Sequence, residues 1–146
     1  MIFRRLFIVL IIVLPIIIAL PACSSGTITP SDTLATDASD ASFIQDIQPI
    51  FNLSCVICHQ GATALGRLNL EEGLSYKNLV NVNSKQSPLK LVAPRDSDGS
   101  YLLNKLRGTQ LQVGGVGVVM PYGTSPLQPS LINMIQQWIE QGAPDN

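Results

Sequence analysis

Hydrophobic and polar positions divide the chain into three parts. Residues 6–20 form an unbroken apolar run, LFIVLIIVLPIIIAL, that follows two arginines. Residues 24–39 are small and polar, with too few apolar side chains to bury a core. From there on, apolar residues recur at helical spacing between turn-forming residues. We therefore expect one folded domain over residues 41–146.

Four segments of this domain are predicted to be helical, at residues 40–51, 70–80, 96–108 and 129–144. In the first, Phe43, Ile47 and Ile50 recur at helical spacing behind an Asp/Ser cap. Pro49 lacks a backbone N–H group, so we expect a kink or break in that helix. The segment 70–80 is a weaker helix, with acidic residues in its first turn.

The last two segments have clearer ends. Gly108 is the expected C-cap of the third, and Ser130 is the expected N-cap of the fourth. One face of the fourth carries Leu131, Ile135, Trp138 and Ile139. Residues 111–123 contain β-branched side chains, but their glycines indicate a loop. The fold class is therefore all-α, with long connections. Four short helices would form only a thin core, so we expect something else to fill the centre.

The first 23 residues have the order of an export signal. Two positive charges precede the apolar run, and small residues end at Cys23. The ending LPAC resembles the lipobox of bacterial lipoproteins, in which the cysteine is lipidated and becomes the new N-terminus. We therefore expect a signal peptide over 1–22 and a lipidated Cys23 with a flexible tether over 23–40.

An uncleaved membrane anchor and ordinary secretion are the alternatives for this N-terminus. All three place the domain outside the cytoplasm. In the lipoprotein case the protein is held on the periplasmic side of a bacterial membrane, and on the outer membrane of a diderm host. Loss of Arg4 and Arg5 with the signal takes the formal net charge from −1 to −3. The domain then has no basic stripe, so nucleic acid is not expected as a partner.

The strongest chemical motif is CVICH, at residues 55–59. A zinc site needs four ligands, and no second Cys/His pair accompanies these residues. A redox dithiol would be expected in a βαβ context, which is absent. A disulfide suits the compartment but gives His59 no role. Covalent attachment of haem c uses all three side chains, because Cys55 and Cys58 bond the vinyl groups and His59 ligates iron.

His59 is the only histidine of the chain, so a second histidine of the same chain cannot be the other axial ligand. The sixth ligand is then methionine, another donor, water or nothing. Met134 lies in the amphipathic helix 129–144, where a core role is expected. Met120 lies in the glycine-rich segment VGGVGVVMPYG, whose glycines we interpret as freedom for the loop. We therefore expect Met120 to be the sixth ligand.

The segments FIQDIQPIFNLSCVICHQG, MPYG and IQQWIEQGAP together resemble a small class I bacterial c-type cytochrome, of the single-haem type found in exported lipoproteins. The resemblance implies a cytochrome c-like fold with helices and long loops around one covalent haem. It also implies His59 and Met120 as iron ligands, and packing of the first helix (Phe43, Ile47) against the last (Trp138, Ile139). Arg95 stands where many relatives have glycine, so the loop geometry there is expected to differ.

The expected function is transfer of single electrons between redox partner proteins, because iron with two protein ligands has no open position for a substrate. The sequence shows no catalytic constellation, so neither an enzyme nor a small-molecule substrate is expected. A haem-based sensor with a labile sixth ligand and a haem-carrying docking domain of a larger complex are the alternatives. Arg95, Tyr101 and Lys105 are candidates for binding the haem propionates.

Overall fold

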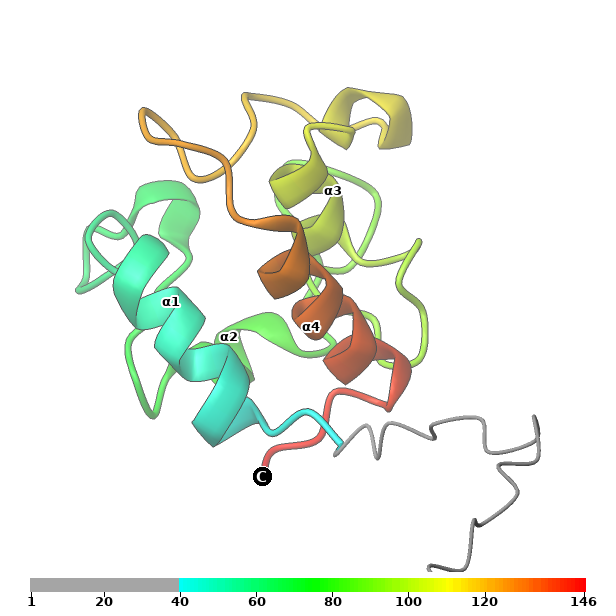
Figure 1. Ribbon diagram of the computed structural model, residues 1–146. Helices are drawn as coiled ribbons and strands as arrows, with labels where there is room; N and C mark the ends of the chain where they lie inside the picture. The colour runs from blue at the N-terminus through cyan, green and yellow to red at the C-terminus, as the bar shows by residue number, and fades with distance from the viewer. Residues whose placement is uncertain (1–39) are drawn as a thin grey trace, which may run out of the picture. The chain divides into compact units, whose positions relative to one another are not determined.

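The computed structural model describes residues 40–146, so the predicted signal peptide, Cys23 and almost all of the tether lie outside the described residues. The described part contains α1 (Gln48–Ser54), α2 (Ser75–Leu79), α3 (Tyr101–Arg107) and α4 (Pro129–Glu140), with short helical turns η1 (Phe43–Ile47), η2 (Leu65–Arg67) and η3 (Gln110–Val113). Extended segments in this range pair through isolated bridges, such as that between Val80 and Val92. The prediction of an all-α protein with long connections is confirmed (Figure 1).

The first predicted helix is present, with a change of helix type in front of Pro49. Ser42 is the N-cap, and its side chain accepts a hydrogen bond from the backbone N–H of Gln45 at 3.2 Å. The following turn is π-helical, and the N–H of Ile47 donates to the Ser42 carbonyl at 3.2 Å. This wide turn ends just before Pro49, which cannot donate a helical hydrogen bond. The helix continues through Pro49 as α1 and does not break.

The second predicted helix is shorter than expected. α2 covers only its last part, because Gly73 adopts a left-handed backbone conformation with φ of 75° and separates the acidic residues from the helix. Glu71 and Glu72 therefore lie outside the helix, where Glu71 is free to bind another segment.

The third predicted helix starts later than the sequence indicated and ends as predicted. Ser100 is the N-cap of α3, but its hydroxyl does not cap the helix. That hydroxyl accepts from the Ala93 N–H at 2.9 Å and donates to the Asp96 carbonyl at 2.7 Å. The acidic residues thus form a turn tied to Ser100. Gly108 ends α3 in the left-handed conformation, with φ of 76°, as predicted.

The fourth helix begins one residue before the cap that we expected. Pro129 occupies its first turn and Gln128 is the N-cap, so the prediction of Ser130 as cap was wrong. Proline suits the first helical position because its fixed φ is helical and its missing N–H would have had no intrahelical partner. The buried face is the predicted one: Ile135, Trp138 and Ile139 are fully buried, and Leu131 is half-buried.

The first and last helices pack against each other through aromatic side chains. The rings of Phe43 and Trp138 lie with their centroids 5.3 Å apart, and the ring of Tyr76 lies 5.2 Å from that of Phe43. Burial of such side chains contributes about 1.5–3 kcal/mol each. This packing fixes α1, and α1 carries the CVICH segment at its C-terminal end.

α3 packs against α4 and carries Leu103 and Leu106 into the same core. The loop from η3 to α4 passes over the end of the molecule at which the turn after α1 also lies (Figure 1). Two segments therefore lie at the same end of the molecule: the turn after α1 and the loop between η3 and α4. Within residues 40–146, no helix has the length and apolar character needed to cross a membrane.

Candidate functional site

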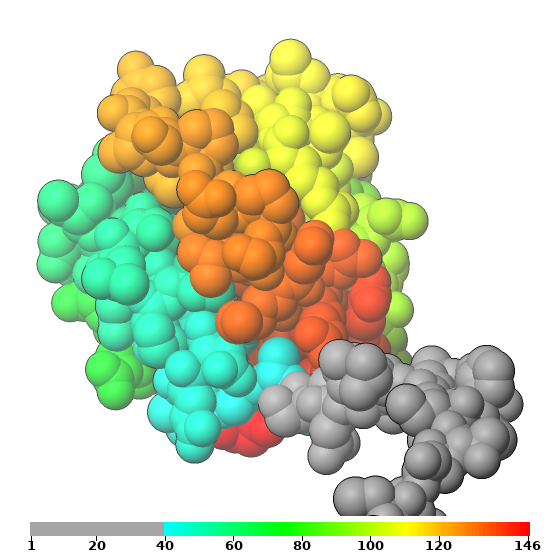
Figure 2. Space-filling view, in the orientation of Figure 1, coloured from blue at the N-terminus to red at the C-terminus, as the bar shows by residue number. Residues whose placement is uncertain are grey.

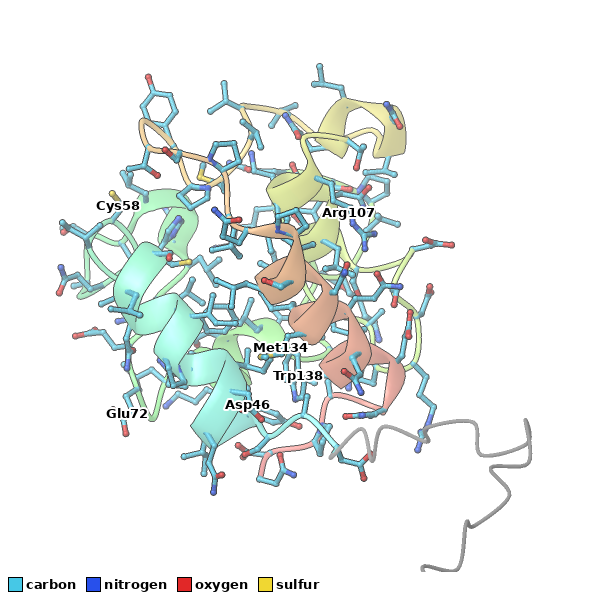
Figure 3. The ribbon with its side chains drawn as sticks, viewed as in Figure 1. Asp46, Cys58, Glu72, Arg107, Met134 and Trp138 are labelled. Atoms are coloured by element: carbon cyan, nitrogen blue, oxygen red, sulfur yellow. The ribbon has the colours of Figure 1, made fainter. Side chains whose placement is uncertain are left out.

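The CVICH segment forms a tight turn directly after α1. The N–H of Cys55 donates to the Phe51 carbonyl at 2.9 Å and continues the helical pattern for one residue. The N–H groups of Cys58 and His59 then both donate to the Cys55 carbonyl, at 3.1 and 3.0 Å. The turn therefore places all three residues of the motif on one short, hydrogen-bonded segment of backbone. Cys58 is exposed on the edge of the molecule (Figure 3).

The imidazole of His59 is oriented by the backbone. Its Nδ1 lies 3.2 Å from the carbonyl oxygen of Leu68. A carbonyl oxygen only accepts hydrogen bonds, so Nδ1 is the protonated nitrogen in this contact. The lone pair of the neutral ring is then on Nε2, which is the arrangement that a metal-ligating histidine requires. A second contact, from the Leu70 N–H to the His59 carbonyl at 2.8 Å, holds the main chain of the histidine in place.

A carboxylate fastens the segment that receives His59. Oε2 of Glu71 accepts from the backbone N–H of Gly61 at 2.9 Å and from the side-chain amide of Asn69 at 2.6 Å. The backbone N–H of Glu71 donates to Oδ1 of Asn69 at 2.9 Å. The hydrogen bond from Gly61, followed by that from Asn69, lowers the pKa of Glu71 below its ordinary value. Residues 59–61 and 68–71 are thereby tied together.

A buried amide holds the same segment from inside. Gln48 is almost fully buried in α1, and its Nε2 donates to the Leu70 carbonyl at 3.1 Å and to Oδ1 of Asn52 at 2.8 Å. Its Oε1 accepts from the hydroxyl of the fully buried Ser75. The sequence analysis did not identify Gln48 or Glu71. Gln48 directly follows the predicted core residue Ile47 in a helix, and this position could have indicated a buried amide.

Both thiols of the motif are free in the structure. Burial, with a smaller effect from Cys58, raises the pKa of the half-buried Cys55 thiol to about 11. Cys55 is therefore protonated near neutral pH, whereas a reactive dithiol needs a cysteine of lowered pKa.

Among residues 40–146, no three His, Cys, Asp or Glu side chains are grouped so that they could hold a metal ion by themselves. A zinc site at this turn would need ligands beyond Cys55, Cys58 and His59.

Met120 belongs to a different segment, the loop between η3 and α4. Its side chain is half-buried and packs against the hydrophobic core, and its backbone N–H donates to the Lys105 carbonyl at 2.9 Å. Residues 122–126, which follow, are exposed, and this part of the chain, in orange, lies on the surface at the upper left of Figure 2. Met134 also packs against the core, but it lies on α4 well away from Cys58 (Figure 3).

Three side chains hold the backbone before Met120. The Tyr101 hydroxyl donates to the Val116 carbonyl at 3.1 Å, and the Gln110 amide donates to the Gly117 carbonyl at 3.0 Å. The ammonium of Lys105 donates to the Val118 carbonyl at 2.5 Å and to that of Val116 at 3.4 Å. Tyr101 and Lys105, two of the propionate candidates, are therefore already engaged with this loop.

The glycines of this loop fix its conformation. Gly114 and Gly117 adopt left-handed conformations, with φ of 69° and 80°. A Cβ atom on Gly115 would lie 2.5 Å from the ring of Tyr101 and 2.7 Å from the Gln110 carbonyl oxygen. Our interpretation of these glycines as freedom for the loop was therefore wrong, because they allow close contacts that immobilise it.

Arg95, the third propionate candidate, lies elsewhere, with its guanidinium against Gly142 after α4. Its backbone N–H donates to the Ile139 carbonyl at 2.8 Å, and its φ is 64°. This is the left-handed region that favours glycine. The backbone thus keeps a glycine-like geometry although the residue is arginine.

No family model, curated protein or solved structure matches this chain. The functional argument therefore depends on the motifs and on the geometry of the described residues.

The hydrogen bonds of Glu71 predict a specific acid sensitivity. A carboxylate whose pKa is lowered on folding stabilises the fold above its unfolded pKa, and this stabilisation is lost as the pH falls through the folded pKa. We expect the free energy of unfolding of the wild type to fall with decreasing pH below about 4.5, and Glu71→Gln to show a smaller decrease. Urea unfolding over this pH range is the measurement.

Glu72→Gln is the matched control, because Glu72 is exposed and carries the same charge next to Glu71 in the sequence. It should retain the wild-type slope. Equal slopes for Glu71→Gln and wild type would show that the Gly61 contact does not act on stability.

Proposed function

We propose that this protein is a monohaem c-type cytochrome that carries single electrons between redox partner proteins. The observation that carries the proposal is the turn of Cys55, Cys58 and His59. It combines two free thiols with an imidazole whose Nδ1 is bonded to a carbonyl oxygen, so that Nε2 is available for iron. C-x-x-C-H with this arrangement is the attachment motif of haem c.

The residues present fit this cofactor. The thiols of Cys55 and Cys58 would form the two thioether bonds, and Nε2 of His59 would be the first axial ligand. Covalently bound haem supplies a one-electron Fe(III)/Fe(II) couple. The hydrogen bond to the Leu68 carbonyl places a ring proton on Nδ1 and orients the ring, so that Nε2 would be the nitrogen offered to iron. The hydrogen bonds of Glu71 with Gly61 and of Gln48 with Leu70 keep the segment that contains this carbonyl in place.

Met120 is the proposed sixth ligand. Two observations support it: the loop that carries Met120 passes over the end of the molecule with the CVICH turn, and hydrogen bonds from α3 and η3 immobilise its backbone. A thioether favours ferrous iron and so raises the reduction potential. With His59 and Met120 both bound to it, the iron would have no free position for a small ligand or substrate.

A cytochrome c-like fold is part of the proposal. The packing of the first and last helices supports it, as does the distribution of exposed apolar side chains. Apart from Ile44 in η1, the large exposed apolar side chains of residues 40–146 lie around the CVICH turn and in η3 and the loop that carries Met120 (Leu53, Ile57 and Leu65; Leu111, Val116, Val118, Val119 and Tyr122). A large apolar cofactor between the two segments would reduce this exposure, which is costly in water.

The proposal also includes export and attachment to a bacterial membrane through lipid on Cys23. Its support is the sequence LPAC after a charged and apolar N-terminal segment. We expect palmitate to label the wild type and not Cys23→Ser, which lacks the thiol that would be acylated. Metabolic labelling of both proteins in the same host is the test. Unchanged labelling of the variant would contradict lipidation at this residue.

Covalent attachment gives the first test of the proposed function. We expect one haem per chain to remain bound after denaturation and acid–acetone extraction, as measured by mass spectrometry. Cys55→Ala and Cys58→Ala should each lose one of the two thioether bonds. Complete extraction of haem from the wild type, or a chain that never acquires haem, would contradict the proposal.

Replacement of Met120 tests the sixth ligand. Ferric wild-type protein should show the weak far-red charge-transfer band of an iron–thioether bond. Met120→Ala should lose this band, bind carbon monoxide in the ferrous state and have a lower reduction potential. Absorption spectra and a redox titration are the measurements.

Met134→Leu is the control for this experiment. The exchange nearly conserves volume, so it should keep the spectrum and cost less than about 1.5 kcal/mol of stability. Loss of the band in Met134→Leu would move the ligand to α4. Ready binding of carbon monoxide by the wild type would favour the sensor alternative.

A further inference from the structure

Lys105 is an unusual residue in α3, because its side chain is buried. Only 8 % of its surface is exposed, and its ammonium is directed at main-chain carbonyls. Burial of an ammonium group is costly unless hydrogen bonds replace its hydration. The carbonyls of Val116 and Val118 supply these bonds, so the charge of Lys105 is bound to the loop before Met120.

The same residue holds the loop at a second point. The Lys105 carbonyl accepts from the backbone N–H of Met120 at 2.9 Å, while its ammonium holds the carbonyl of Val118 at 2.5 Å. The chain on either side of Val119 is therefore fixed to one residue of α3. Residues 122–126 are exposed and receive no hydrogen bond from α3. Among the contacts that hold this loop, those of Lys105 therefore reach the positions nearest to Met120.

Neighbouring contacts place the rest of the loop. Tyr101 and Gln110 hold Val116 and Gly117, as described above, and Gly115 allows the Tyr101 ring to approach the backbone. These contacts act on residues three to five positions before Met120. Lys105 alone combines a charged contact with a direct hydrogen bond to the methionine backbone.

We propose that Lys105 is the positioning residue for Met120 and that its ammonium keeps the thioether in place as the sixth ligand. The inference rests on the proposed function, since it assigns to Lys105 the closure of the second axial position. Without the ammonium, the loop would keep the contacts of Tyr101 and Gln110 but would lose its charged attachment at Val118. The methionine would then leave the iron for part of the time, and an external ligand could enter.

The experiment compares full-chain haem-loaded proteins: wild type, Lys105→Met, Lys105→Arg and Lys85→Met. Methionine keeps the apolar stem of the lysine and removes the donor. Arginine keeps the charge and can donate to the same carbonyls. Lys85 is an exposed loop residue, so Lys85→Met controls for the loss of one positive charge.

Three readouts are used: the far-red band of the ferric protein, binding of carbon monoxide to the ferrous protein, and hydrogen–deuterium exchange of residues 114–122. We expect Lys105→Met to weaken or lose the band, to bind carbon monoxide, and to exchange this segment at least about tenfold faster, as expected from the loss of charge-assisted hydrogen bonds. Lys105→Arg should restore the band, and Lys85→Met should match the wild type in all three readouts.

A folded Lys105→Met protein with an unchanged band, no carbon monoxide binding and unchanged exchange would overturn the inference. If this variant yields no folded protein, Lys105→Gln replaces it, because glutamine keeps a shorter neutral donor. Partial loss of the band would then support the inference, and an intact band without carbon monoxide binding would overturn it. Absence of the band from the wild type would contradict Met120 ligation itself, so the two failures are distinguishable.

Discussion

The hydrogen bond between Nδ1 of His59 and the carbonyl oxygen of Leu68 is the contact on which the candidate site depends. It decides which nitrogen of the ring carries the proton and so which one is available for iron. The contact survives only if the Leu68 segment stays fixed against the turn after α1. Glu71 fastens that segment at the surface, and Gln48 fastens it from the core.

The two segments of the proposed haem site, one with His59 and one with Met120, are held in the same way. In each, a side chain with several hydrogen-bonding positions holds a backbone segment that has no regular secondary structure. Gln48 and Glu71 serve the histidine half, whereas Lys105 serves the methionine half. Loops of this length would lose conformational entropy on ordering, and these bonds offset part of that cost. The short helices supply fixed positions for the side chains that do so.

The sequence was sufficient to predict the all-α class and the approximate positions of the helices, because helical periodicity is a local signal. The sequence prediction failed where contacts outside a helix set the position at which the helix begins. Residues 96–100 were expected in the third helix, but they form a turn that the Ser100 hydroxyl holds through the Asp96 carbonyl. Residues 70–74 were expected in a helix, but Gly73 turns the backbone and frees Glu71 for Gly61. The burial of Lys105 could not be predicted, since a lysine late in a helix is ordinarily exposed.

The contacts of the histidine half have a consequence for the order of folding. Every partner that orients His59 lies between Gln48 and Ser75, so this half closes through short loops of low entropic cost. Met120 is likewise attached to nearby Lys105. The contacts of longest range include those of the first and last helices, such as Phe43 with Trp138. Two local units of low contact order can therefore acquire native-like structure separately, and the pairing of the terminal helices brings them together.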